Sequence, residues 1–487
     1  MKQAERAAVA SGGGRFGLLQ KNAITVLGAV ALAMAFMAPG GSTFFETQPA
    51  AAGAGFATPL GFILALLVCL IVASTIASFA KKLPAAGFAY TFNTQGLGKR
   101  AGFISGWILA LSYGMVGPMI FPALGAFSSD FLKSQFNLSL PWWLLMIGFV
   151  IVIWAIVARG VSVTATTALV FLVIEVGVFV ALGLTIVFKG GAEGVSLGPF
   201  NPANSLSGVS GLGIGMLWGI LAFVGFESAG TLGEETADSK RNIPRALYAA
   251  AGIIGLFYVF VMYAAVIGYG RHHMNALVGD STPWFTLVKN YWGAGVSWIL
   301  ALTVINSSFA NMIAGSNAAI RVVFAMGREA IFPSVLGRTN AKGTPFTAAT
   351  GYMGFSLVIG LAVGLLIGPF GAFAFFGSIL GLGIVLTWIL LNISLIVFYR
   401  SRYPQEFSIV RHGILPVVAS VLMLLPLYGQ LWPIPAFPNN LVPYIVLAWV
   451  VIGFVYLVTI QRSRPTVFNG MGRVWVDDPL ILEPPRP

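Results

Sequence analysis

Long apolar stretches, separated by short polar segments, run through almost the whole chain. A helix needs roughly 20 mainly apolar residues to cross the hydrocarbon core of a bilayer, and by this measure the sequence predicts an all-α membrane protein with about twelve transmembrane helices. The expected spans are residues 22–46, 59–80, 101–127, 141–158, 164–188, 208–233, 247–270, 296–326, 346–368, 372–399, 412–432 and 440–461. Residues 1–21 and 462–487 are expected to be cytoplasmic tails.

The composition agrees with this pattern and narrows the class of protein. Charged residues make up 9% of the chain and apolar residues 57%, whereas an ordinary soluble domain carries roughly 25% charged residues. So little polar surface cannot cover a water-soluble fold, which excludes a soluble enzyme, a nucleic-acid-binding protein and a disordered chain. The single cysteine, Cys69, rules out a disulfide framework and a cysteine-based metal site. We therefore expect no cofactor and no metal.

The distribution of positive charge predicts how the helices are oriented. In a twelve-span arrangement, all but four of the 27 lysines and arginines fall on the same side of the membrane. The four exceptions are Lys133, Lys189, Arg271 and Lys289. Because cytoplasmic loops are enriched in lysine and arginine, we expect a multi-pass protein of the cytoplasmic membrane with both termini in the cytoplasm. The net charge of +12 then faces anionic lipid and requires no nucleic acid.

Two of the predicted spans contain residues that interrupt a helix. The first span carries Pro39, which cannot donate a backbone hydrogen bond, followed by Gly40 and Gly41. The sixth span carries Gly225 and Glu227 within apolar sequence. Glycines in membrane helices also serve close helix packing, but interruptions at matching places in two halves are typical of secondary transporters. The pattern predicts two inverted repeats and a pair of additional helices, over about 22–188, 208–399 and 412–461.

The interrupted helices also indicate what could bind between them. Beyond the first interruption a new helix begins near Ser42, and its free N–H groups and positive dipole end suit a carboxylate. The first half of span six ends near Ala222 and Phe223, where free carbonyl groups suit an ammonium group. Together the two ends match the backbone of an amino acid, and Phe223 is a candidate lid, although an aromatic side chain in a membrane helix also serves simple packing.

Several motifs resemble those of the amino acid–polyamine–organocation superfamily of permeases, and the resemblance covers nearly the whole chain. The first span carries a Gly-x-Gly-x-Phe-like break in which a serine replaces the second glycine. The loop after span two resembles Pro-x-x-Gly-x-Tyr, and span six and its exit resemble Phe-x-Gly-x-Glu followed by Glu-Glu and Ile-Pro-Arg-Ala. These motifs are Gly40-Gly41-Ser42-Thr43-Phe44, Leu83-Pro84-Ala85-Ala86-Gly87-Phe88-Ala89-Tyr90, Phe223-Val224-Gly225-Phe226-Glu227-Ser228, Glu234-Glu235 and Ile243-Pro244-Arg245-Ala246.

The resemblance implies the LeuT-like fold of five plus five inverted helices, with helices one and six broken, and transport of amino-acid-like substrates by alternating access. It further implies a substrate site made by both breaks. The carboxylate would be held by Gly40, Gly41, Ser42 and Thr43, and the amine by Ala222, Phe223 and Val224, with Gly225 beside them.

Two acids inside apolar spans are candidates for coupling or gating. Glu175 lies in span five, where an ionised acid costs about 2.5–3.5 kcal/mol on the insertion scale, and we interpret it as a proton carrier. The alternative is a permanently protonated acid that bonds a backbone carbonyl or a group of span one. Sodium coupling through Ser307 and Ser308 is the rival mechanism. Glu227 is interpreted as a gate or interhelical link, or else as a tie to unwound backbone.

The remaining polar residues give less specific signals. Glu46 is expected at the solvated outer rim, and the cytoplasmic loop with Glu234, Glu235 and Asp238 is either an inner gate or simply solvated. Candidate pocket walls are Ser112, Tyr113, Asn311 and Phe375. Because no buried acid is evident in spans three, eight or ten to pair with a second ammonium group, we expect neutral amino acids as substrates, and Glu175 predicts their symport with protons. A sodium-coupled symporter, an exchanger and a carrier of polyamines or other organic amines are the alternatives. The sequence shows neither the continuous polar path of a channel nor the catalytic residues of a membrane enzyme.

Overall fold

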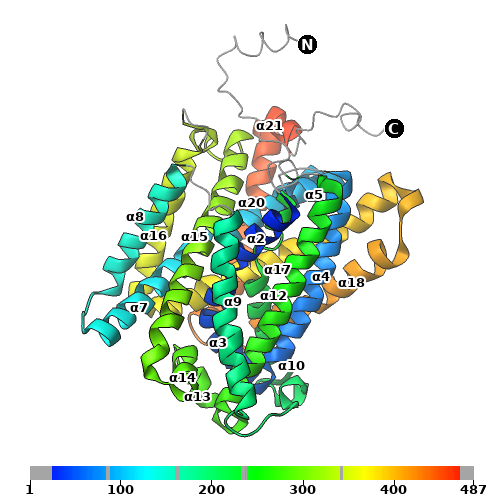
Figure 1. Cartoon of the computed structure of the whole chain (residues 1–487). Helices are drawn as coiled ribbons and strands as arrows, with labels where there is room; N and C mark the ends of the chain where they lie inside the picture. Colours follow the sequence, from blue (N-terminus) through cyan, green and yellow to red (C-terminus); the bar gives the residue numbers. More distant parts are fainter. Residues whose placement is uncertain are drawn as a thin grey trace.

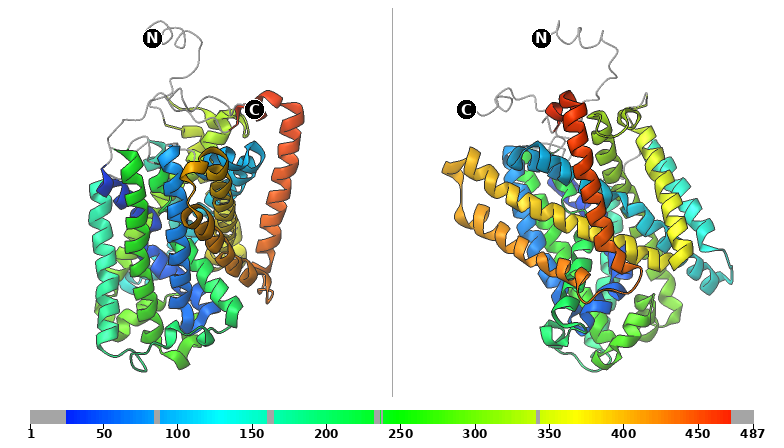
Figure 2. Two further views of the ribbon diagram at one scale, coloured as in Figure 1. Left: turned by 90° about the vertical axis from the view of Figure 1, so that its right-hand side faces the viewer. Right: turned by 180° about the vertical axis from the view of Figure 1, so that it is seen from behind.

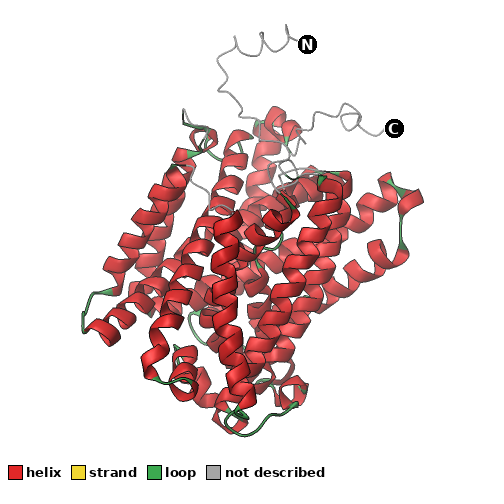
Figure 3. Ribbon diagram, viewed as in Figure 1, coloured by secondary structure: helices red, strands yellow, loops and turns green. Residues whose placement is uncertain are grey.

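The computed structural model describes residues 25–83, 88–159, 165–231, 236, 238–340 and 344–471. Every regular element in these ranges is a helix (Figure 3), as expected for a chain whose backbone must satisfy its hydrogen bonds inside lipid. The expected tail over 1–21, the Pro84 to Gly87 motif and the Glu234-Glu235 pair lie outside the described residues, so their predicted roles stay predictions. Of the expected tail over 462–487, the structure describes residues 462–471.

The helices follow one another along the chain (Figure 1). They are α2 (Val26–Met37), α3 (Pro39–Ala54), α4 (Thr58–Lys82), α5 (Phe88–Leu97), α6 (Lys99–Gly114), α7 (Val116–Phe136), α8 (Trp142–Ala158), α9 (Ala165–Phe188), α10 (Gly208–Phe223), α11 (Ser228–Thr231), α12 (Ser239–Tyr269), α13 (Met274–Gly279), α14 (Pro283–Tyr291), α15 (Ser297–Arg328), α16 (Phe346–Ile367), α17 (Pro369–Arg402), α18 (Leu415–Leu422), α19 (Leu424–Leu431), α20 (Val442–Ser463) and α21 (Pro465–Gly470).

Ten helical segments in the described part of the chain are long and apolar enough to cross a membrane, so this is an integral membrane protein. One of the ten, Val26–Lys82, joins α2, α3 and α4 and covers residues 26–46 of the first expected span and the whole of the second. The fourth expected span corresponds to the shorter apolar helix Trp142–Ala158. The count of twelve therefore stays a prediction.

Both predicted interruptions are breaks in helices. α2 ends at Met37, Ala38 adopts a left-handed conformation (φ 45°, ψ 65°), and α3 starts at Pro39. The first break thus lies just before the predicted Pro39 to Gly41, because proline is well suited to the first position of a helix. In the sixth expected span, α10 ends at Phe223, Gly225 has φ 123°, and α11 starts after Glu227.

The helices around these breaks form the centre of the bundle. α4 packs along α12, α10 lies against α3 and α4, and α9 lies against α2. α8 and α16 lie side by side at one edge (Figure 1). α18, α19 and α20 lie at the periphery (Figure 2). Trp107 of α6 and Trp449 of α20 hold these two helices together. Their indole rings stack with centroids 4.7 Å apart, and each indole N–H donates to the backbone carbonyl of the other residue.

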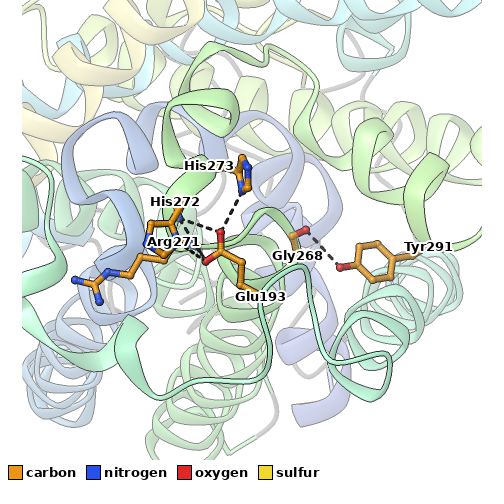
Figure 4. A network of polar contacts seen from close by, with 6 residues as sticks. All are labelled: Glu193, Gly268, Arg271, His272, His273 and Tyr291. Atoms are coloured by element: carbon orange, nitrogen blue, oxygen red, sulfur yellow. Dashed lines mark hydrogen bonds and ion pairs between the residues drawn. The ribbon is translucent and has the colours of Figure 1, made fainter.

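The two ends of the bundle differ. α5 and α21 lie at one end, and α13 and α14 lie at the other (Figures 1 and 2). At the α13/α14 end, the Glu193 carboxylate joins the loop after α9 to the residues after α12 (Figure 4). It accepts hydrogen bonds from the backbone N–H groups of Arg271 and His272, and it lies 3.0 and 3.1 Å from the Nδ1 atoms of His272 and His273. α14 closes this end over α3, because the Trp284 indole N–H reaches the Thr43 carbonyl at 3.0 Å.

Candidate functional site

The two helix breaks touch each other at Gly225. A side-chain Cβ on Gly225 would lie 2.8 Å from Cγ of Phe36 and 3.0 Å from the backbone nitrogen of Met37. Both the positive φ and this close approach require glycine at the position. The sequence-predicted partners, the end of α2 and the end of α10, are therefore brought together in the middle of the bundle.

Side chains from α3, α12 and α15 satisfy the carbonyl groups that the first break exposes. The Tyr258 hydroxyl lies 3.0 Å from both the Met37 and the Ala222 carbonyl oxygens, so its one proton serves both broken helices. The Asn311 side-chain amide donates to the Phe36 carbonyl at 2.8 Å, and the Ser42 hydroxyl donates to the Met37 carbonyl at 3.0 Å. Such partners are necessary because lipid offers none. Sequence reasoning missed Tyr258, since a tyrosine in an apolar helix gives no signal of this role.

A cavity of about 40 Å³ lies beside the two breaks. Its apolar wall comes from α2, α3, α7, α10 and α17 and the residues that end them, and its polar wall comes from α3 and α15. The apolar lining residues are Phe36, Ala38, Phe45, Val116, Met119, Ile120, Leu221, Val224, Phe373 and Leu380. The other lining residues are Gly41, Ser42, Glu46, Ser308 and Asn311.

The predicted substrate-binding residues divide between the cavity and its surroundings. Gly41, Ser42 and Val224 line the cavity. Phe223, the candidate lid, is fully buried and packs edge-on against Tyr258 instead. Thr43 is fully buried under Trp284.

Other predicted residues act through their backbone or lie elsewhere. The Ala222 carbonyl faces Tyr258, and Gly40 faces Glu175 rather than the cavity. Of the candidate pocket walls, Asn311 lines the cavity, whereas Ser112, Tyr113 and Phe375 are not among its lining residues.

The N–H groups expected to hold a carboxylate already have partners within the protein. The Gly41 N–H donates to the Ser307 hydroxyl at 2.9 Å, and the Ser42 N–H donates to the Ala38 carbonyl at 2.8 Å. A bound carboxylate would therefore have to displace Ser307 or accept a weaker contact.

Glu46 lines the cavity and is only 3% exposed, so the expectation of a solvated rim position is wrong. α14 covers this part of α3, because Trp284 bonds to the Thr43 carbonyl and the Thr47 hydroxyl. One carboxylate oxygen of Glu46, Oε2, has no hydrogen-bond partner among the described residues.

Glu175 reaches the first break from α9. It is 2% exposed, and its Oε2 atom would lie 3.0 Å from a Cβ placed on Gly40. Its polar neighbours are the Gly40 backbone and the Ser307 side chain, and Ser307 in turn accepts the Gly41 N–H. The predicted proximity of Ser307 and Ser308 to the first break is also found, because both hydroxyls would lie 3.5 Å from a Cβ on Gly41.

Glu227 holds the second break in place with both of its carboxylate oxygens. Oε2 accepts the Gly225 N–H at 2.9 Å, and Oε1 accepts the Tyr113 hydroxyl of α6 at 2.8 Å. The side chain is fully buried. Glu227 therefore combines the two interpretations made from the sequence, a tie to the unwound backbone and a link between helices.

Broken helices that meet beside a cavity in the middle of a membrane bundle are the arrangement of secondary transporters. The sequence model of the family described as amino acid permease matches residues 24–459. The chain therefore belongs to the amino acid permease family, whose members are transporters and not enzymes.

Several known transporters are similar to the chain over most of their length. The branched-chain amino acid permease BcaP of Lactococcus lactis is 26% identical over 396 residues, which cover 74% of this chain and 79% of the relative. The low-affinity putrescine importer PlaP of Escherichia coli is 24% identical over 453 residues, covering 91% and 94%. The methylthioribose transporter of Bacillus subtilis is 25% identical over 388 residues, covering 76% and 79%. These relatives carry small organic molecules of different kinds.

Proposed function

We propose that the protein is a secondary active transporter that moves amino acids or related amines across the cytoplasmic membrane by alternating access. The observation that carries this proposal is the cavity beside both helix breaks, where Gly225 of one break packs on Phe36 and Met37 of the other. A movement that separates the two breaks would open the cavity. The family membership supports a carrier rather than a channel.

The proposed architecture has twelve membrane-spanning helices in two inverted repeats, over about residues 22–188 and 208–399, with two further helices over about 412–461. In this arrangement each of spans one to five corresponds to the span five places later. Packing contacts in the first set of spans then have counterparts in the second set. The contact of α2 with α12 corresponds to that of α10 with α4, and the contact of α9 with α2 and α3 corresponds to that of α17 with α10. α8 and α16, the counterparts of each other, also pack together.

The proposed orientation places the α5 end and both termini in the cytoplasm. Lys81, Lys82, Lys99 and Arg100 border α5, whereas Lys189 and Arg271 lie at the opposite end. The excess of positive residues at the α5 end supports this orientation through the positive-inside rule. Cysteine labelling from either side of the membrane, in a background that lacks Cys69, tests it.

Proton coupling through Glu175 is the proposed driving mechanism. The acid lies against Gly40 at the first break, so a change of its charge would act directly on the geometry that holds the two breaks together. Glu175→Gln should preserve exchange of bound substrate in proteoliposomes and abolish accumulation driven by a pH gradient. Glu406→Gln, which changes a more exposed acid paired with Lys82, is the matched control. Undiminished accumulation in Glu175→Gln would reject the mechanism.

Sodium coupling remains the rival, and Ser307 and Ser308 beside the first break are its supporting observation. Uptake measured with sodium replaced by choline separates the two mechanisms. Neutral amino acids are the first proposed substrates, and amines are the second. Uptake of branched-chain amino acids, putrescine and methylthioribose by purified protein in liposomes tests the function itself. Failure to transport any of the three, together with no thermal stabilisation by a wider amino acid and amine panel, would count against it.

A further inference from the structure

Three buried polar atoms with no hydrogen-bond partner in the described part of the chain belong to residues that line the same cavity. They are Oε2 of Glu46, Oγ of Ser308 and Oδ1 of Asn311. Glu46 and Ser308 are 3% and 2% exposed. Buried polar atoms are normally hydrogen-bonded. Three unpaired polar atoms on residues around one cavity therefore indicate a ligand that supplies the missing hydrogen bonds.

The three side chains lie on helix faces that line the cavity. Glu46 follows Ser42 by four residues in α3, so both side chains lie on the same face of that helix, and both line the cavity. Asn311 uses its amide nitrogen on the Phe36 carbonyl, which leaves its amide oxygen as a free acceptor. Ser308 precedes Asn311 by three residues on the same face of α15.

The chemistry of the three atoms selects a cationic donor. An ionised carboxylate and an amide oxygen can only accept hydrogen bonds, and a serine hydroxyl can accept as well. Among the described residues, no lysine, arginine or histidine lines the cavity, so an ionised Glu46 would have no counter-ion from the protein there. A primary ammonium group carries three N–H donors and one positive charge, which matches three acceptors of which one belongs to a carboxylate.

We propose that Glu46, Ser308 and Asn311 form an ammonium subsite in the transport cavity, so that a side-chain carboxylate recognises the amine of the substrate. This inference rests on the proposed transport function and goes beyond it, because the breaks alone would bind an amine through backbone carbonyls. The remaining lining of Phe36, Phe45, Val116, Met119 and Ile120 suits an apolar body attached to the ammonium group. The substrate class is therefore a primary amine with an apolar portion, either a free amine or the amine end of an amino acid.

The test measures thermal stabilisation of the purified full-length protein by four probes. Butylamine and leucine carry the primary ammonium, butyltrimethylammonium keeps the charge without any N–H donor, and butanol keeps the chain without the charge. At least one of the first two should stabilise the wild-type protein, and neither of the last two should. Stabilisation by butylamine but not leucine assigns the subsite to free amines, and the reverse result assigns it to amino acids.

Variants then assign the effect to the subsite. Glu46→Gln should raise the Kd of the stabilising probe by about tenfold or more, which is the loss expected for a hydrogen bond to a charged group. Ser308→Ala should raise it by about threefold or more and provides a second measurement should Glu46→Gln not fold. Glu406→Gln, distant in sequence and more exposed, is the control that should bind as the wild type does.

Two results would overturn the subsite while leaving the transport function intact. One is unchanged affinity for the ammonium probe in both Glu46→Gln and Ser308→Ala. The other is stabilisation by sodium alone that disappears in Glu46→Gln, which would make the three oxygens ion ligands. Absence of transport of any substrate by the wild-type protein would instead reject the proposed function, so the two failures are distinguishable.

Discussion

Gly225→Ala should disrupt the contact between the two broken helices. The new methyl group would lie 2.8 Å from Cγ and 2.9 Å from Cβ of Phe36, and 3.0 Å from the Met37 nitrogen. The two nearest of these atoms lie at the base of the side chain and the third is backbone, so rotation of the phenyl ring does not relieve the clash. The backbone angle of φ 123° adds strain for any residue with a Cβ.

The magnitude follows from these two effects. A non-glycine residue in a sparsely populated backbone region costs about 1–3 kcal/mol, and overpacking of a dense interior costs about 1–3 kcal/mol. Gly225→Ala is therefore expected to destabilise the protein by about 2–6 kcal/mol.

Thermal unfolding of purified protein in detergent measures the effect, and uptake in proteoliposomes measures its functional consequence. Gly354→Ala is the matched control, because a Cβ at Gly354 in α16 would meet no atom within 4 Å and alanine is the better helix former. Gly225→Ala should melt several degrees below both the wild type and Gly354→Ala. Equal melting temperatures for the two variants would refute the proposed contact between the breaks.

Two further perturbations test the surroundings of the site. Tyr258→Phe removes the hydroxyl shared by the Met37 and Ala222 carbonyls and should lower stability by about 1–3 kcal/mol in the same unfolding assay; no loss would mean that water or another group replaces it. At the α13/α14 end, burial acts to raise the pKa of Asp280, but the Thr286 and Tyr269 hydroxyls and the Thr282 N–H outweigh it and hold the pKa below its usual value of 3.8. A lowered pKa means that the ionised acid contributes stability above its unfolded value and loses it as the pH falls through the folded value. Asp280→Asn should therefore cost about 1 kcal/mol at pH 7, after allowance for solvent screening, and in unfolding scans the difference from wild type should shrink as the pH falls below 3.8 and vanish below the folded pKa.

The breaks could be predicted from the sequence because their signals are local. Proline at position 39 and glycine at positions 40, 41 and 225 restrict or release the backbone wherever they occur. A buried acid in an apolar helix is equally visible, and Glu175 and Glu227 were found for that reason. Each of these inferences needs only the identity of neighbouring residues.

Glu46 could not be placed in this way, because its burial depends on contacts between distant parts of the chain. From the sequence, an acid about two turns beyond a break is expected near the membrane surface. In the structure, α14 covers that part of α3, with the Trp284 indole bonded to the Thr43 carbonyl and the Thr47 hydroxyl. The apolar wall from α7 and α17 completes the enclosure. No periodicity within α3 indicates either covering element.

The three buried acids near the breaks have different partners, and the partners predict different roles. Glu227 has both oxygens engaged by Gly225 and Tyr113, so its neutralisation should weaken the fold of the second break. Glu175 faces the Gly40 backbone and Ser307 but does not line the cavity, so its neutralisation should alter the driving force and spare binding. Glu46 lines the cavity with an unsatisfied oxygen, so its neutralisation should weaken binding. Three single variants, with glutamine at one of the three positions in each, should therefore lose stability, coupling and substrate recognition respectively. Identical phenotypes in the three variants would contradict this assignment.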